Sequence, residues 1–112
     1  MRLAIAFCLI AFPAAVYAKQ ARCLIEVDGK AFTFGQCNAD REKDGSLSVG
    51  TGDASRSPIF AIVNATDGAS AEGYWNEEPR ASHAQSPLGT MRKSGGCWVN
   101  EWAKVCAWPS SR

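Results

Sequence analysis

The sequence predicts an all-β domain, a small antiparallel sandwich or barrel of about seven strands with two disulfides. Short runs of alternating apolar and polar residues recur along the chain, and Asp-Gly or Gly-Gly pairs separate them. Beyond residue 18, no segment carries an apolar stripe with helical spacing. The same region holds an even number of cysteines, which suits a disulfide framework.

Residues 1–18 have the features of a secretory signal peptide. A positive start precedes the apolar run from Leu3 to Phe12, and small residues typical of a cleavage site end at Ala18. We therefore expect cleavage after Ala18 and a single mature domain at residues 19–112, located in the periplasm or secreted. No other stretch approaches about 18 apolar residues, so we expect no membrane span.

The charges are balanced and evenly distributed along the chain. Its 112 residues include twelve Lys and Arg and eleven Asp and Glu. A nucleic-acid-binding protein needs a basic face, and the linear sequence contains no basic cluster. The composition therefore argues against nucleic acid as a partner and favours one globular domain.

Four cysteines remain in the mature domain, at Cys23, Cys37, Cys97 and Cys106. Their spacing lacks the paired C-x2-C knuckles of zinc ribbons, so disulfides are favoured over a metal site. Three pairings are possible. We expect Cys23–Cys37 and Cys97–Cys106, because each of these pairs brackets its own hairpin signal. No metal and no cofactor are expected.

The first hairpin is predicted around Asp28-Gly29. A two-residue turn pairs Val27 with Lys30. This register places Cys23, Ile25, Phe32 and Phe34 on one buried face. Further along, Ser46 to Gly50 is predicted as a short strand with Leu47 and Val49 inward, and residues 50–58 as a surface loop.

The second hairpin is predicted around Asp67-Gly68. It joins Ile59–Ala65 to Ala69–Trp75, with Phe60 opposite Trp75. Within the returning strand, Gly73 indicates a bulge or space for an aromatic ring. The polar segment Asn76–Pro87 is predicted as a loop.

The third hairpin is predicted around Gly95-Gly96, between Leu88–Lys93 and Cys97–Val99. After the connection Asn100–Trp102, the last strand is expected to run from Ala103 to Trp108. This return places Cys97 opposite Cys106.

Catalytic groups are sparse. His83 is the only histidine, and it lies in a polar loop without a third group to orient it. Glu77 and Glu78 are adjacent, whereas glycoside hydrolysis needs two carboxylates across a cleft. We therefore expect that the protein is not an enzyme.

The tryptophans are concentrated in the last third of the chain. Trp75 is expected in the core, and Trp98 on the face opposite the nearby disulfide. Trp102 lies in a tight connection, either as an exposed anchor for a partner or folded back over the disulfide. The candidate contact residues are Trp102, Trp98, Tyr74, Arg80 and His83.

The segments Gly96-Cys-Trp-Val-Asn100 and Val105-Cys-Ala-Trp108 carry a resemblance. Together with Leu88-Gly-Thr-Met, they resemble the ending of small uncharacterised periplasmic proteins of Gram-negative bacteria. In size, signal peptide and disulfide-stapled β-architecture, the chain is also similar to periplasmic lysozyme inhibitors. This second likeness concerns architecture alone, so no binding residues are carried over.

These observations favour a non-enzymatic binding protein in the periplasm or outside the cell, an inhibitor of a cell-wall-degrading enzyme or of a toxin. An alternative is a glycan-binding module that stacks Trp98 or Trp102 on peptidoglycan sugars. A structural envelope protein without a tight partner is a further alternative. The expected partner is thus another protein or a cell-wall glycan.

Overall fold

The computed structural model describes residues 19–33, 35–51 and 57–109. The expected signal peptide, Phe34 and most of the expected 50–58 loop lie outside the described residues. Within the described part, the chain forms nine strands, and it has no helix long and apolar enough to cross a membrane. The strands are β1 (Lys19–Val27), β2 (Lys30–Thr33), β3 (Gln36–Arg41), β4 (Leu47–Val49), β5 (Ala61–Ala65), β6 (Ser70–Trp75), β7 (Ser86–Ser94), β8 (Cys97–Val99) and β9 (Ala103–Pro109).

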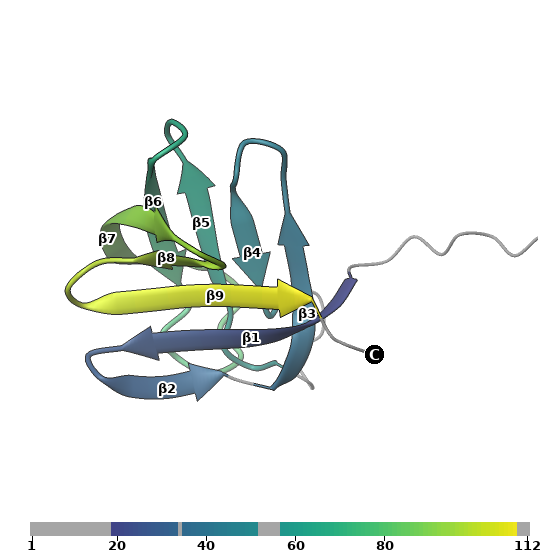
Figure 1. Ribbon diagram of the computed structural model, residues 1–112. Helices are drawn as coiled ribbons and strands as arrows, with labels where there is room; N and C mark the ends of the chain where they lie inside the picture. The colour runs from purple at the N-terminus through teal and green to yellow at the C-terminus, as the bar shows by residue number, and fades with distance from the viewer. Residues whose placement is uncertain (1–18, 34, 52–56, 110–112) are drawn as a thin grey trace, which may run out of the picture.

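The strands form a closed antiparallel barrel (Figure 1). Neighbours in the sheet follow the order β2, β1, β3, β4, β5, β6, β7, β8, β9, and β9 pairs again with β1. This last pairing closes eight strands into a barrel and leaves β2 as an extra strand on β1. The predicted all-β class is therefore confirmed in its barrel form, with eight barrel strands plus one rather than about seven.

β1 closes the barrel because it is long enough to serve three neighbours. One edge pairs with β9 from Ala21 to Val27. The other edge pairs first with β3, at Lys19–Arg22, and then with β2, at Ile25–Val27. β2 therefore lies at one end of the barrel. At this end β1 and β6 finish and β7 and β9 begin, and we call it the open end.

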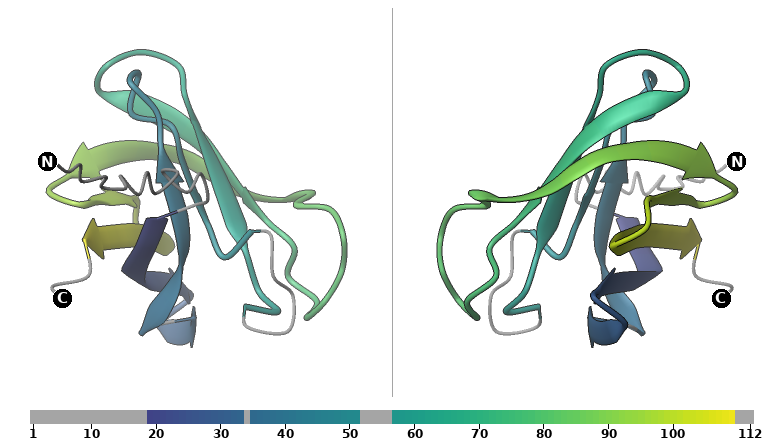
Figure 2. Two further views of the ribbon diagram at one scale, coloured as in Figure 1. Left: turned by 90° about the vertical axis from the view of Figure 1, so that its right-hand side faces the viewer. Right: turned by 90° about the vertical axis from the view of Figure 1, so that its left-hand side faces the viewer.

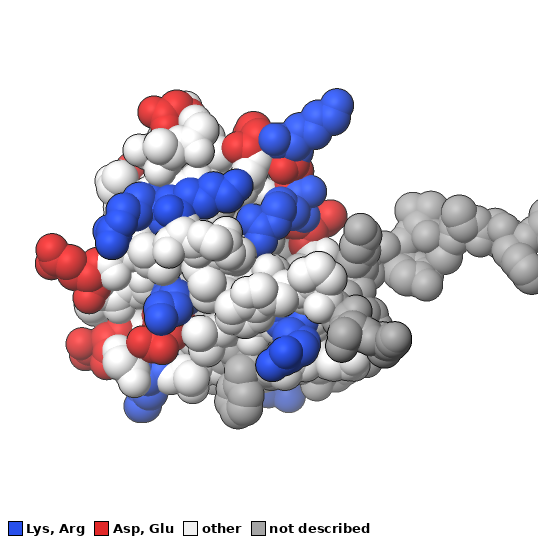
Figure 3. Space-filling view, in the orientation of Figure 1, with Lys and Arg blue, Asp and Glu red and all other residues white. Residues whose placement is uncertain are grey.

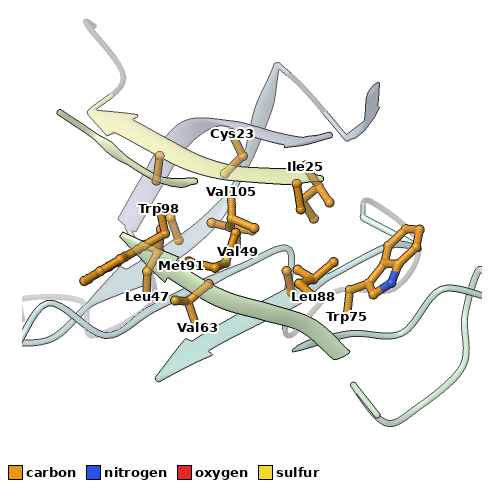
Figure 4. Close-up of a cluster of buried hydrophobic side chains, with 14 of the residues drawn as sticks. Cys23, Ile25, Leu47, Val49, Val63, Trp75, Leu88, Met91, Trp98 and Val105 are labelled. Atoms are coloured by element: carbon orange, nitrogen blue, oxygen red, sulfur yellow. The ribbon is translucent and has the colours of Figure 1, made fainter. Parts of the chain in front are cut away.

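Alternating side chains of the strands fill the barrel interior (Figure 4). Leu47 and Val49 are buried, as their alternation predicts. Trp75 is also buried, which confirms its expected place in the core, and it lies on the opposite side of the cluster from Trp98. The fully buried side chains include Ile25, Leu47, Val49, Val63, Leu88, Met91, Trp98 and Val105.

Both expected disulfides are present. Cys23 and Cys37 join β1 to β3, with their Cα atoms 6.0 Å apart. Cys97 and Cys106 join β8 to β9 directly opposite each other, with their Cα atoms 4.0 Å apart. Disulfides persist in oxidising compartments, so these two bonds in a small β domain fit an extracellular or periplasmic location.

The first hairpin follows the predicted turn but not the whole predicted register. Asp28 and Gly29 both have positive φ, 55° and 80°, and Val27 pairs with Lys30 as expected. A bulge then shifts the ladder, so that Ile25 pairs with Thr33 instead of Phe32. The prediction of a buried Phe32 was therefore wrong, and 37% of this residue is exposed.

The second hairpin has a longer turn than predicted. Asp67 accepts hydrogen bonds from the amides of Ala69 and Ser70, at 2.8 and 2.9 Å, and thereby stabilises a wider loop. The ladder shifts by one residue, so Trp75 pairs with Ala61 rather than with Phe60. The inward side chains of β5 are consequently those of Ala61 and Val63, two residues apart on the strand.

Gly73 lies at a register shift between β6 and β7, which confirms the predicted bulge. A Cβ at this position would lie 2.6 Å from the Sδ atom of Met91, so methionine rather than an aromatic ring fills the space. The third hairpin turns at Gly95-Gly96 as predicted, with Ser94 paired to Cys97.

Candidate functional site: a groove at the open end

A groove of about 830 Å³ lies at the open end of the barrel. The β1–β2 hairpin forms one wall, the end of β6 and the start of β7 form another, and the β8–β9 turn completes it. Ten residues line the groove: Val27, Asp28, Gly29, Lys30, Phe32, Trp75, Glu77, Ser86, Pro87 and Trp102.

Two aromatic rings meet across this groove. Phe32 of β2 and Trp75 of β6 have ring centroids 4.9 Å apart and planes inclined by 62°, an edge-to-face contact. Trp75 is buried, so it supports the more exposed Phe32 ring from below. The Nζ atom of Lys30 lies 5.6 Å from the Phe32 centroid and places a positive charge at the rim.

Trp102 is the third aromatic residue of the groove and is 44% exposed. The Oδ1 atom of Asn100 accepts hydrogen bonds from the amides of Trp102 and Ala103, at 2.8 and 2.7 Å. The Nδ2 atom of Asn100 donates to the carbonyls of Leu88 and Thr90, at 2.9 and 3.0 Å. One side chain therefore ties the turn that carries Trp102 to β7.

A backbone bond joins the two turns of the open end. The amide of Asp28 donates to the carbonyl of Trp102 at 2.8 Å, so the β1–β2 hairpin and the β8–β9 turn support each other. The groove residues include neither cysteine of the β8–β9 disulfide. Of the two positions expected for Trp102, the structure therefore favours exposure in the groove over packing on that disulfide.

Polar groups lie between the groove and a second hollow. Glu77 accepts a hydrogen bond from the Ser86 hydroxyl at 2.8 Å, and both residues border the groove and the second hollow. The second hollow, of about 300 Å³, also contains His83. His83 is exposed, and its Nδ1 atom lies 3.1 Å from the Oγ atom of Ser82.

The loop between β6 and β7 is anchored by the buried Asn76. Its Nδ2 atom donates to the carbonyls of Pro58, Glu78 and Ala81, and its Oδ1 atom accepts from the amide of Phe60. Figure 2 shows this loop beside the short stretch just before β5, residues 57–60. These hydrogen bonds hold the backbone next to Glu77 in place, and with it this wall of the groove.

Trp98 is not part of the accessible surface. Its side chain is fully buried, and its Nε1 atom donates to the carbonyl of Gly45 at 3.0 Å. The Nζ atom of Lys93 lies 5.8 Å from the Trp98 ring. In the turn that contains Gly45, the amide of Ser46 donates a hydrogen bond to the Asp44 carboxylate. This bond lowers the pKa of the Asp44 carboxyl below its ordinary value. Trp98 therefore closes the other end of the barrel, which corrects the expectation that it contacts a partner.

The remaining candidates are dispersed. Tyr74 lies on β6 between Ile62 and Pro87, and neither Tyr74 nor Arg80 lines the groove. Trp102 therefore shares the groove with Phe32 and Trp75, and not with Tyr74 or Arg80. Sequence reasoning missed Phe32, since a bulge that moves one residue has no local signal.

The described lining of the groove combines apolar and charged side chains. Its three aromatic residues offer apolar contact, and Asp28, Glu77 and Lys30 add charged groups around them. Comparisons with protein-family models, curated proteins and solved structures find no match for this chain.

Proposed function

We propose that this is a periplasmic or secreted, non-enzymatic binding protein that contacts its partner through the groove at the open end. The observation that carries the proposal is the exposed Trp102 beside the Phe32–Trp75 pair. Exposed tryptophans in concave sites are typical anchors of binding interfaces.

The anchor is organised before binding. The Asn100 hydrogen bonds hold the turn, and the Asp28 amide joins it to the neighbouring hairpin. Because the backbone around Trp102 is already ordered, binding loses little further conformational entropy there. This rigidity favours a specific partner over loose association.

A protein partner is the leading interpretation, with the chain acting as an inhibitor of a cell-wall-degrading enzyme or of a toxin. The tips of two tight turns, at Asp28-Gly29 and Glu101-Trp102, are exposed and lie side by side at the open end. Two braced turns of this kind suit insertion into the cleft of an enzyme, where rigid loops bind with little reorganisation.

The arrangement of Glu77 and Asp28 around the rings favours a second candidate, a glycan-binding module. Aromatic rings stack on the apolar faces of sugars, and carboxylates accept hydrogen bonds from sugar hydroxyls. The two candidates place the ligand in the same groove but differ in what the ligand is.

The test compares two exposed tryptophans. Trp102→Ala removes the anchor, whereas Trp108→Ala removes a tryptophan of similar exposure on β9, outside the groove. Purified protein is assayed for inhibition of lysozyme and other wall-degrading enzymes, and for retention on peptidoglycan sacculi. We expect Trp102→Ala to weaken the active interaction by about 2 kcal/mol, roughly thirtyfold, and Trp108→Ala to leave it unchanged.

The melting temperature of each variant separates binding from stability. A Trp102→Ala protein that loses stability but keeps its affinity per folded molecule contradicts the proposal. Inhibition without retention on sacculi supports the protein partner, and retention without inhibition supports the glycan. Absence of both interactions leaves the structural envelope protein as the better description.

A further inference from the structure

One part of the barrel wall carries Lys and Arg almost without acidic residues. The adjacent strands β7, β8 and β9 contain Arg92, Lys93 and Lys104 and no Asp or Glu. Arg22 of β1 and Arg41 of β3 extend this set. All five side chains are exposed, and we call them the basic belt. Figure 3 shows Lys and Arg spread over this face, with Asp and Glu mainly towards its margins.

The strand registers determine how the charges are spaced. Arg92 lies opposite Val99, which lies opposite Lys104, so two strand spacings separate the cations, about 10 Å. The guanidinium of Arg41 donates to the carbonyls of Gly96 and Ala107, each at 3.2 Å, and is thereby held beside β8 and β9. The belt is therefore a series of spaced charges and not a single pocket.

The belt cations have no acidic partner within the part of the chain that the structure describes. Among the described residues, none of the five belt cations forms a salt bridge. The belt strands carry two acidic residues, Glu26 of β1 and Asp40 of β3. Glu26 lies opposite Lys104 in the ladder, and neither carboxylate forms an ion pair with a belt cation. Arg41 uses its donors on backbone carbonyls, which carry no net charge. An anionic ligand would thus meet cations that have no competing partner.

We infer that the basic belt binds an anionic polysaccharide, a flexible glycan chain that carries repeated carboxylate or phosphate groups. From β7 to β3 the belt crosses four of the eight strand spacings of the barrel, about half of its circumference. A flat membrane surface touches such a curved wall along one strip only, whereas a flexible chain follows the curve. Arg22, Arg92 and Lys104 lie on the outer wall, whereas Lys93 and Arg41 lie opposite the buried Trp98 and Leu47 at the barrel end that Trp98 closes. The site is therefore independent of the groove, and it rests only on the location outside the cytoplasm.

The experiment uses protein secreted from cells that express the full chain. Binding to polygalacturonate, and to neutral dextran as the uncharged comparison, is measured by calorimetry between about 0.01 and 0.15 M salt. We expect binding to polygalacturonate alone, with an affinity that falls as salt rises. Arg92→Gln and Lys104→Gln should each weaken it about three- to tenfold at low salt and reduce the salt slope by about one.

Arg80→Gln is the matched control, because it removes one exposed positive charge from the loop between β6 and β7, away from the belt. It should leave the affinity for polygalacturonate unchanged, as should the groove variant Trp102→Ala. Equal loss with Arg80→Gln overturns the inference, as does a lack of binding at low salt. Tighter belt-dependent binding to vesicles of anionic phospholipid, or to single-stranded DNA, overturns it in favour of those ligands.

Discussion

Replacing Asn100 with Ala should release the turn that carries Trp102. The Asn100 side chain makes four hydrogen bonds of 2.7 to 3.0 Å, two as donor to carbonyls and two as acceptor from amides. Each such bond contributes about 1 kcal/mol net. Asn100 is partly exposed, so water replaces some of the lost bonds, and we expect a total loss of about 2–3 kcal/mol.

For a domain of this size, each 1 kcal/mol of lost stability lowers the melting temperature by about 4–8 °C. Asn100→Ala should therefore melt about 10–20 °C below the unmodified protein in a thermal scan followed by circular dichroism. Asn64→Ala is the matched control, since Asn64 is exposed on β5 and its side chain makes no hydrogen bond in the described structure. It should melt within about 3 °C of the unmodified protein.

The same variant also tests the link from turn to groove. Any ligand that depends on Trp102 should bind Asn100→Ala more weakly even at temperatures where the variant is fully folded, because Trp102 is no longer held in place. If Asn100→Ala melts with the Asn64→Ala control, the four hydrogen bonds do not stabilise the turn, and this account of the anchor is refuted.

Three further predictions concern the fold. Gly50→Ala should lower the free energy of unfolding in urea by about 2–5 kcal/mol. Gly50 has φ +82°, and an added Cβ would lie 2.6 Å from the carbonyl oxygen of Ile59. Gly29 has a similar φ of +80° but no atom within 4 Å of the added Cβ, so Gly29→Ala should lower the free energy of unfolding by only about 1–2 kcal/mol. Equal losses in the two variants would show that backbone strain alone acts and the steric clash at Gly50 does not. In dithiothreitol with iodoacetamide, the β8–β9 disulfide should be reduced, and its two thiols alkylated, before the fully buried β1–β3 disulfide, because Cys97 is partly exposed; peptide mapping that finds the reverse order contradicts this. Because the pKa of Asp44 is lowered in the folded protein, its carboxylate adds stability above the unfolded pKa of 3.8, and this contribution is lost as the pH falls towards the folded pKa. Asp44→Asn should therefore show a smaller fall in melting temperature in acid than the unmodified protein.

The local features of this protein were predictable. The hairpin turn at Asp28-Gly29, the inward side chains of β4 and the Gly95-Gly96 turn depend on neighbouring residues, and all three were predicted. Errors arose where one residue changes a register. The Asp67 side chain widens the second turn, and the bulge at Phe32 shifts the first ladder, and neither change alters the apolar alternation from which registers are inferred.

The candidate site was predictable only in part. An exposed Trp102 in a tight connection was among the expected positions, but Trp98, another candidate contact residue, proved to be core. Both tryptophans lie close to the same cysteine in the chain. Their difference comes from the distant turn at Gly45, whose carbonyl accepts the Trp98 hydrogen bond. Burial of a side chain depends on which remote segment covers it, and sequence spacing does not report this.

The β class, the approximate position of most strands and both disulfide pairings were predictable, because alternation, turn residues and cysteine spacing act over short distances. Closure into a barrel was not, since it depends on pairing between the two ends of the domain, β1 and β9. The same closure brings Phe32, Trp75 and Trp102 into one groove. It also brings cations that are dispersed along the sequence together in the basic belt. These surfaces consist of residues far apart in the chain, so their chemistry exists only after the distant strands have paired.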